Sequence, residues 1–157
     1  MILIIAEKGD DDFLIYENTI QSRRRIHDTL LLTIAPTMDC NFHCPYCFEH
    51  KVKGIMKSET SDNIIKWISQ YPNISNIKIT WFGGEPLLAP DVIQYFTEKL
   101  RVSTQATLGK NSIITNGYFL TKENIQILEN CGINSIQVSM DGIYEYLSNS
   151  DIVQKNN

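Results

Sequence analysis

Apolar and polar positions alternate in blocks along the chain, and the apolar blocks predict strands. The run at 29–35 (TLLLTIA) is continuously apolar, as expected for a strand that is covered on both faces. Three later blocks, at 77–81, 112–115 and 135–140, have the length and β-branched content of further strands. The spacing therefore predicts four strands separated by longer segments.

The segments between these strands have the apolar spacing of helices. The first helix is expected to be capped at 58–60 and stopped by Pro72, the second to start at Pro90, and the third to run from a Thr121 cap to Gly132. The inward stripes are expected to consist of Ile64, Ile68 and Tyr71 in the first helix, and of Ile93, Phe96 and Leu100 in the second.

Strands that alternate with helices predict an α/β fold with a parallel sheet and right-handed crossovers. About four βα units make an open, curved sheet rather than a closed eight-fold barrel. Residues 29–157 are therefore expected to form a partial (β/α) TIM-like barrel, or to be a piece of something longer. Residues 1–28 are expected to form an N-terminal β-hairpin extension, with strands at 2–6 and 13–16 around an acidic turn. We expect the later strands of a complete barrel to be missing.

Each predicted strand ends in a turn that is polar or rich in glycine. These turns lie at 40–47, 83–86, 116–117 and 139–142. In parallel α/β sheets, ligands bind outside the carboxyl ends of the strands. The four turns are therefore expected to converge on one mouth, which is the candidate functional site.

Composition narrows the class of protein. The chain has 157 residues, 43% hydrophobic and 20% charged, as expected for one globular domain, and its formal net charge of −4 argues against nucleic-acid binding. The first residues (MILIIA) lack the basic start of a signal peptide, and no apolar run approaches the roughly 20 residues of a membrane span. We therefore expect a cytoplasmic protein with no membrane partner and with reduced thiols, whose clustered cysteines indicate a metal.

Three cysteines lie within eight positions, at Cys40, Cys44 and Cys47. Structural zinc takes four ligands, so a zinc site would also need His43 or His50, and a zinc-stabilised interaction module remains an alternative. An iron–sulfur cube fits better, because thiolates from one loop can bind three irons of a [4Fe-4S] cluster. The fourth iron would then be open to a small molecule.

Cys131 is the remaining cysteine. It could supply a fourth ligand, but it lies at the end of the helical stripe that contains Ile127. A small buried apolar side chain is the simpler interpretation of such a cysteine.

Four motifs, in chain order and each after a predicted strand, resemble those of the radical S-adenosylmethionine (SAM) enzymes. They are Cys40-x3-Cys44-x2-Cys47 with Tyr46 before the last cysteine, Gly83-Gly84-Glu85-Pro86 (GGEP), Thr115-Asn116-Gly117, and Ser139-Met140-Asp141-Gly142. The overlap covers about residues 29–142. The residues of these motifs are most similar to those of the peptide- and protein-modifying branch, which includes the anaerobic sulfatase-maturating enzymes.

The resemblance implies two cofactors, a [4Fe-4S] cluster held by Cys40, Cys44 and Cys47, and SAM, whose amino and carboxylate groups chelate the open iron. The GGEP turn, Gly83 to Glu85, would offer backbone groups or the Glu85 carboxylate to the methionine ammonium. Glycines allow such a close backbone approach. The alternative for Glu85 is an exposed turn carboxylate.

Four further residues would bind SAM by the same resemblance. Tyr46 would lie near the adenine or pack against the cluster, and Ser139 would hydrogen-bond the ribose or the methionine carboxylate. Asn116 and Asp141 are the remaining cofactor-binding candidates, although Asn-Gly and Asp-Gly pairs are also typical of tight turns.

The reaction that the resemblance implies starts with one electron from a donor such as flavodoxin or ferredoxin. The reduced cluster passes it to the SAM sulfonium, releasing methionine and a 5′-deoxyadenosyl radical, which takes hydrogen from a peptide or protein substrate. The branch commonly adds a C-terminal domain with auxiliary clusters, which we expect to be missing here. A non-catalytic, truncated relic that keeps the cluster or SAM pocket is the alternative.

Overall fold

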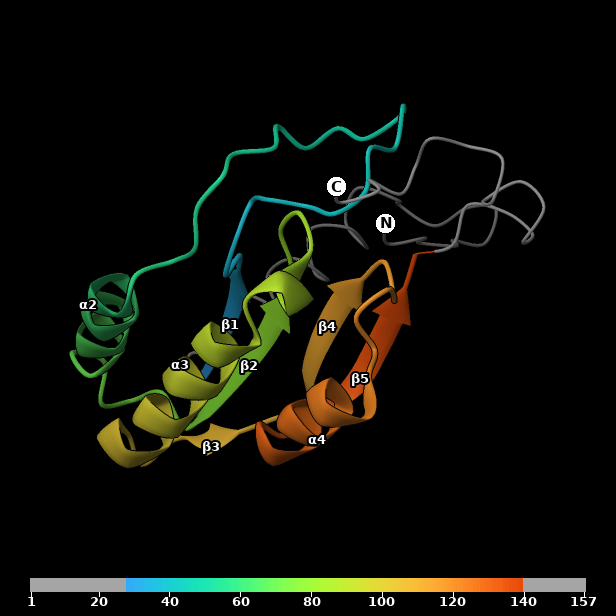
Figure 1. Cartoon of the computed structure of the whole chain (residues 1–157). Helices are drawn as coiled ribbons and strands as arrows, with labels where there is room; N and C mark the ends of the chain where they lie inside the picture. Colours follow the sequence, from blue (N-terminus) through green and yellow to red (C-terminus); the bar gives the residue numbers. More distant parts are fainter. Residues whose placement is uncertain (1–27, 140–157) are drawn as a thin grey trace, which may run out of the picture.

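Strands and helices alternate through residues 28–139, the part of the chain that this computed structural model describes (Figure 1). The elements are β1 (Thr29–Ile34), α2 (Ser58–Ile68), β2 (Asn76–Trp81), the 3-10 helix η1 (Pro86–Leu88), α3 (Pro90–Ser103), β3 (Thr107–Leu108), β4 (Asn111–Thr115), α4 (Lys122–Asn130) and β5 (Ile133–Val138). The predicted alternation is confirmed, with the two-residue β3 as an unpredicted addition. The predicted hairpin strands at 2–6 and 13–16 lie outside the described residues.

All pairings in the sheet are parallel, in the order β1-β2-β4-β5, and β3 pairs with β2 at the side of this path. Figure 1 shows the arrowheads of the main strands at one edge of the sheet, with the helices on one face. The segment between β1 and α2 passes over that edge. The predicted parallel, open α/β arrangement is therefore confirmed.

The core lies between β2 and α3. Ile77, Ile79 and Trp81 of β2 are buried, and Trp81 meets Phe96 of α3 edge-to-face, with ring centroids 5.6 Å apart. The predicted stripe of α3 is confirmed, because Ile93, Phe96 and Leu100 are all fully buried. Pro90 is the first residue of α3, where a proline costs no helical hydrogen bond.

The third predicted helix also has the expected ends. Thr121 is its N-cap, and the Thr121 hydroxyl accepts a hydrogen bond from the Asn124 N–H. Gly132 follows the helix with a φ of +71°, the left-handed conformation that glycine adopts without strain.

The predicted cover of β1 is wrong for the part of the chain that the structure describes. There β1 is not covered on both faces, because Leu31 is 71% exposed while Ile34 is 6% exposed. The described helices lie on one face of the sheet, so alternate side chains of β1 stay in solvent. From the sequence alone, the apolar run around Leu31 cannot be distinguished from a strand whose two faces are both buried.

The first helix differs in its cap and in its stripe. Its N-cap is Lys57, which makes no side-chain capping bond. The buried positions of α2 are Ser61, Ile65 and Ile68. The predicted stripe is therefore confirmed at Ile68, Ile64 is partly buried against the core, and Tyr71 is 47% exposed. α2 ends at Ile68, so Tyr71 lies outside the helix. The helical spacing of 3.6 residues, from which its burial was predicted, does not apply there.

Replacing Phe96 by alanine should lower the free energy of unfolding by about 3–5 kcal/mol, because it removes a fully buried ring and leaves a cavity. Chemical denaturation followed by circular dichroism measures this. Val102→Ala is the matched control on the same helix: Val102 is 85% exposed, so its change should stay within about 0.5 kcal/mol. Equal losses in the two variants would contradict the described core.

Candidate functional site

The segment that carries the three cysteines is pinned at both ends beside the end of β1. Thr37 and Ile55 form an antiparallel bridge, and the Met56 N–H donates to the Pro36 carbonyl at 2.7 Å. The Thr37 hydroxyl donates to the Gly54 carbonyl at 2.6 Å. The cysteines therefore lie on a closed loop, residues 38–54, anchored at the carboxyl edge of the sheet.

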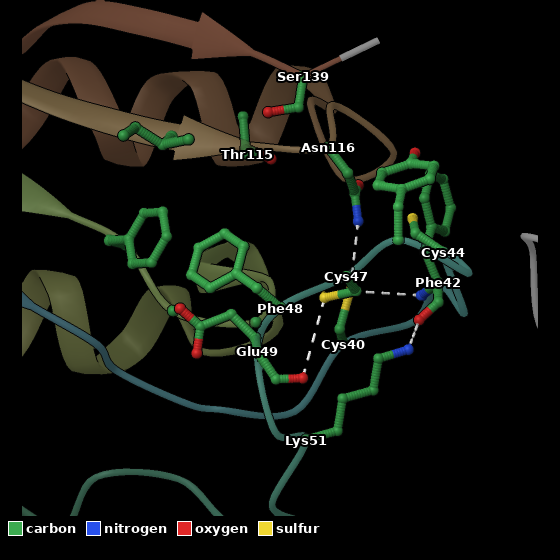
Figure 2. A pocket seen from close by; sticks show the side chains of 15 residues that line it. Cys40, Phe42, Cys44, Cys47, Phe48, Glu49, Lys51, Thr115, Asn116 and Ser139 are labelled. Atoms are coloured by element: carbon green, nitrogen blue, oxygen red, sulfur yellow. Dashed lines mark hydrogen bonds between the residues drawn. The ribbon is translucent and has the colours of Figure 1, made fainter. Parts of the chain in front are cut away.

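A cavity of about 260 Å³ lies between this loop and the strand ends (Figure 2). Its walls contain predicted residues from all four turns, namely Cys40, Cys44, Tyr46, Cys47, Gly83, Gly84, Asn116 and Ser139. The predicted convergence of the turns is thus confirmed for these residues, while their individual roles stay predictions. Asp141 lies outside the described residues, and Glu85 is buried and is not one of the residues that line the cavity.

The two glycines bring the turn after β2 against the loop after β1. A Cβ on Gly83 would lie 2.3 Å from the Thr37 carbonyl oxygen, and one on Gly84 would lie 2.2 Å from that of Asp39. Gly83 also has a φ of +117°. The N–H groups of Gly84 and Glu85 donate to the Thr37 and Asp39 carbonyls, at 3.2 and 2.8 Å. Only glycine permits this contact between the two turns.

The Glu85 carboxylate is fully buried and ties the turns after β2 and β4 together. It accepts hydrogen bonds from the Leu87 N–H at 2.9 Å, from the Asn116 N–H at 2.8 Å, and from the Thr115 hydroxyl at 2.8 and 3.0 Å. The alternative of an exposed turn carboxylate is therefore wrong for Glu85. Its predicted contact with the methionine ammonium stays a prediction, and both carboxylate oxygens already accept bonds from the protein.

The Asn116 side chain reaches from the turn after β4 to the cysteine loop (Figure 2). Its amide nitrogen donates to the Asn41 side-chain oxygen at 3.0 Å and to the Cys40 Sγ at 3.7 Å. Its oxygen accepts from the Tyr118 N–H at 3.0 Å. Asn116 thus belongs both to the predicted turn and to the wall of the site.

Burial raises the pKa of the Cys40 thiol, and the nearby Glu85 carboxylate raises it further. The Phe42 N–H, the Lys51 ammonium and the Asn116 amide act in the opposite direction but do not cancel the effect of burial. Cys40 is therefore a protonated thiol in the metal-free chain at neutral pH. Binding of iron at this sulfur must release that proton.

Cys131 takes no part in the cavity wall. It is 2% exposed within the hydrophobic core, and burial raises the pKa of its thiol. The simpler interpretation, a small buried apolar side chain, is confirmed for Cys131.

The cysteine loop fits a cluster with several irons. Cys40, Cys44 and Cys47 are free thiols that line the same cavity, although within residues 28–139 no group of three Cys, His, Asp or Glu side chains is close enough to hold one metal ion. A cube places each thiolate on a different iron, so the sulfurs need not meet at one point. The buried Asn41 side-chain nitrogen also has no hydrogen-bond partner among the described residues, which leaves a donor for a bound group.

Several residues of the site were not singled out from the sequence. Asn41 belongs to the hydrogen-bond network, Lys51 donates to the Phe42 carbonyl, and Phe82 lines the cavity. Thr115 was named only as part of its motif, and its bond to Glu85 was not predicted. The other three residues carry no local pattern that marks them.

Comparison with known proteins identifies the family. A family model described as the Radical SAM superfamily matches residues 34–157. The chain belongs to this superfamily. Its members bind a [4Fe-4S] cluster and SAM. The predicted family is confirmed, and the fold is a partial radical SAM core with a TIM-like arrangement.

Curated relatives that are named for different molecules each match more than two thirds of this chain. The GTP 3',8-cyclase of Lactiplantibacillus plantarum is 30% identical over 128 residues, covering 80% of this chain and 37% of the relative. The AdoMet-dependent heme synthase of Methanosarcina barkeri is 33% identical over 107 residues, covering 68% and 29%. The chain spans about a third of the length of these curated relatives. The predicted peptide-modifying branch is not established by them.

Among solved structures, anSMEcpe with bound AdoMet and Cp18Cys peptide has a TM-score of 0.63 and 31% identity, over 74% of this chain and 33% of that one. BtrN in complex with AdoMet and 2-DOIA, at 24% identity and a TM-score of 0.53, covers 75% and 49% and agrees in fold. None of the helices within residues 28–139 is long and apolar enough to cross a membrane.

Replacing Glu85 by alanine should lower the free energy of unfolding by about 3 kcal/mol, because two buried donors and one half-buried donor lose their acceptor at about 1–3 kcal/mol each. Denaturant titration measures this. Glu98→Ala is the matched control, because Glu98 is exposed on α3 and accepts one bond from Gln94. A Glu85 variant as stable as the Glu98 variant would contradict the network.

Replacing Gly84 by alanine should destabilise the chain by about 1–3 kcal/mol and reduce iron uptake, because the new Cβ would push the Asp39 carbonyl and the cysteine loop away. Unfolding measurements and iron per chain after anaerobic reconstitution test this. Gly109→Ala is the control: there the new Cβ meets the flexible Lys78 side chain at 3.0 Å. Normal iron uptake by the Gly84 variant would show that the close approach is dispensable.

Proposed function

We propose that this chain is the cofactor-binding part of a radical SAM enzyme, with a [4Fe-4S] cluster on Cys40, Cys44 and Cys47 and with SAM in the adjoining cavity. The observation that carries the proposal is that the three thiols and the GGEP glycines line one cavity at the carboxyl edge of the sheet. A cluster held by these cysteines would supply the electron for reductive cleavage of bound SAM, the source of the radical that would take hydrogen from the substrate.

The chain's own residues bind and orient SAM. Gly83 and Gly84 line the cavity and offer backbone groups to the methionine part. Ser139 lines the cavity from the end of β5, and its hydroxyl suits the ribose or the carboxylate. Tyr46 lines the cavity from the cysteine loop and offers a ring for the adenine.

Apolar side chains form part of the wall around the place where the radical would form. Phe42, Phe48, Phe82 and Ile114 line the cavity beside the polar residues. Phe42 packs edge-to-face on Tyr118, with ring centroids 5.9 Å apart. Apolar side chains around a reactive intermediate protect it from side reactions with water.

For the substrate we propose a peptide or protein, and for the electron donor a flavodoxin or ferredoxin. Support comes from anSMEcpe, which was solved with a bound peptide and is 31% identical over 74% of this chain. GTP is the second candidate, because GTP 3',8-cyclases match at similar identity. Anaerobic incubation of the chain with SAM, reductant and either a cysteine-containing peptide or GTP, followed by mass spectrometry, separates the two.

Anaerobically reconstituted and reduced protein should give the electron paramagnetic resonance signal of a [4Fe-4S] cluster, and the signal should change when SAM is added. Alanine at Cys40, Cys44 or Cys47 should abolish it, because each thiolate binds one iron. Cys131→Ala is the matched control and should keep the signal, because Cys131 lies in the core.

The other outcomes discriminate between the alternatives. A cluster signal that ignores SAM, without formation of 5′-deoxyadenosine, would identify a non-catalytic relic. Stoichiometric zinc with no iron after anaerobic purification would identify a zinc-stabilised interaction module and would contradict the proposed function.

A further inference from the structure

The orientation of the Asn116 amide is fixed by a neighbouring backbone group. The Tyr118 N–H can only donate, so the Asn116 oxygen must face it, at 3.0 Å. The amide nitrogen then faces the cysteine loop, where it lies 3.7 Å from the Cys40 Sγ and 3.0 Å from the Asn41 oxygen. The two amide hydrogens thus have two acceptors, one of which is a sulfur.

The backbone of Asn116 is held as firmly as its side chain. Its N–H donates to the buried Glu85 carboxylate at 2.8 Å, and the adjacent Thr115 hydroxyl accepts from the Gly117 N–H at 3.0 Å. Glu85 itself is 0% exposed. The amide donor that faces Cys40 is therefore in place before any iron binds, and it needs no rearrangement to point at the sulfur.

Turn formation alone does not account for asparagine at this position. The turn needs only a side-chain oxygen that accepts the Tyr118 N–H, and an aspartate would supply the same oxygen. The amide nitrogen, which aspartate lacks, is used only toward Asn41 and Cys40.

We propose that Asn116 is a positioning residue that donates a hydrogen bond to the Cys40 sulfur when this sulfur carries iron, and thereby makes the cluster easier to reduce. The inference rests on the proposed function, since it needs the cluster on Cys40. Hydrogen bonds to cluster sulfurs set the reduction potential, because a donor stabilises the more negative, reduced cluster more than the oxidised one. The Phe42 N–H, 3.4 Å from the same sulfur, adds a second donor from the backbone.

The test is an equilibrium redox titration of the reconstituted chain without SAM, followed by electron paramagnetic resonance. Asn116→Ala removes the donor without changing charge, and Asn116→Asp removes it while keeping the turn acceptor. Both should lower the midpoint potential, with about a tenfold shift in the one-electron reduction equilibrium, equivalent to about 59 mV. Asn63→Ala is the matched control, because Asn63 is exposed on α2, and it should leave the potential unchanged.

Each result decides the matter. Lowered potentials in both Asn116 variants, with normal iron content, support the inference. Unchanged potentials, or a decrease only in the aspartate variant, which would be an effect of charge, overturn it. Loss of iron from both Asn116 variants but not from the Asn63 variant would replace it with a purely structural role. Absence of a cluster in the unmodified chain would instead remove the proposed function itself.

Discussion

A buried carboxylate is the interaction on which the site depends. An ionised side chain taken out of water is costly unless hydrogen-bond donors surround it, and Glu85 finds such donors on its own turn and on the turn after β4. Two strand ends that are far apart in sequence must therefore come together before the charge is compensated. The same requirement places Asn116 at the edge of the cysteine loop.

The cysteine loop itself depends on backbone contacts rather than on packing. Tyr46 and Phe48 are 59% and 81% exposed, so the loop buries little apolar surface of its own. Its position comes from the Thr37 and Asp39 carbonyls, which accept the N–H groups of the GGEP turn. A bound cluster would add covalent links to this weakly packed segment, so metal binding and loop ordering are coupled in the proposed enzyme.

Local periodicity was enough to predict most of the fold. The stripe of Ile93, Phe96 and Leu100 and the Thr121 cap were predictable because each is set within a few residues of sequence. The exposure of Leu31 and the burial of Glu85 could not be predicted, because both depend on which element, distant in sequence, packs against the residue. The same holds for the site. Its motifs could be recognised in the sequence, but the hydrogen bonds between its turns, such as that from Asn116 to Cys40, could be found only in the tertiary structure.

The matched stretch carries chemistry that its relatives share. A GTP 3',8-cyclase, a heme synthase and the peptide-bound anSMEcpe are all 30–33% identical to this chain, over 68–80% of its length. Proteins named for such different molecules have in common the family's cluster and SAM. The predicted cofactor residues lie at the ends of β1, β2, β4 and β5, which are neighbours in one sheet. In the proposed function, these strand ends therefore serve cofactor binding.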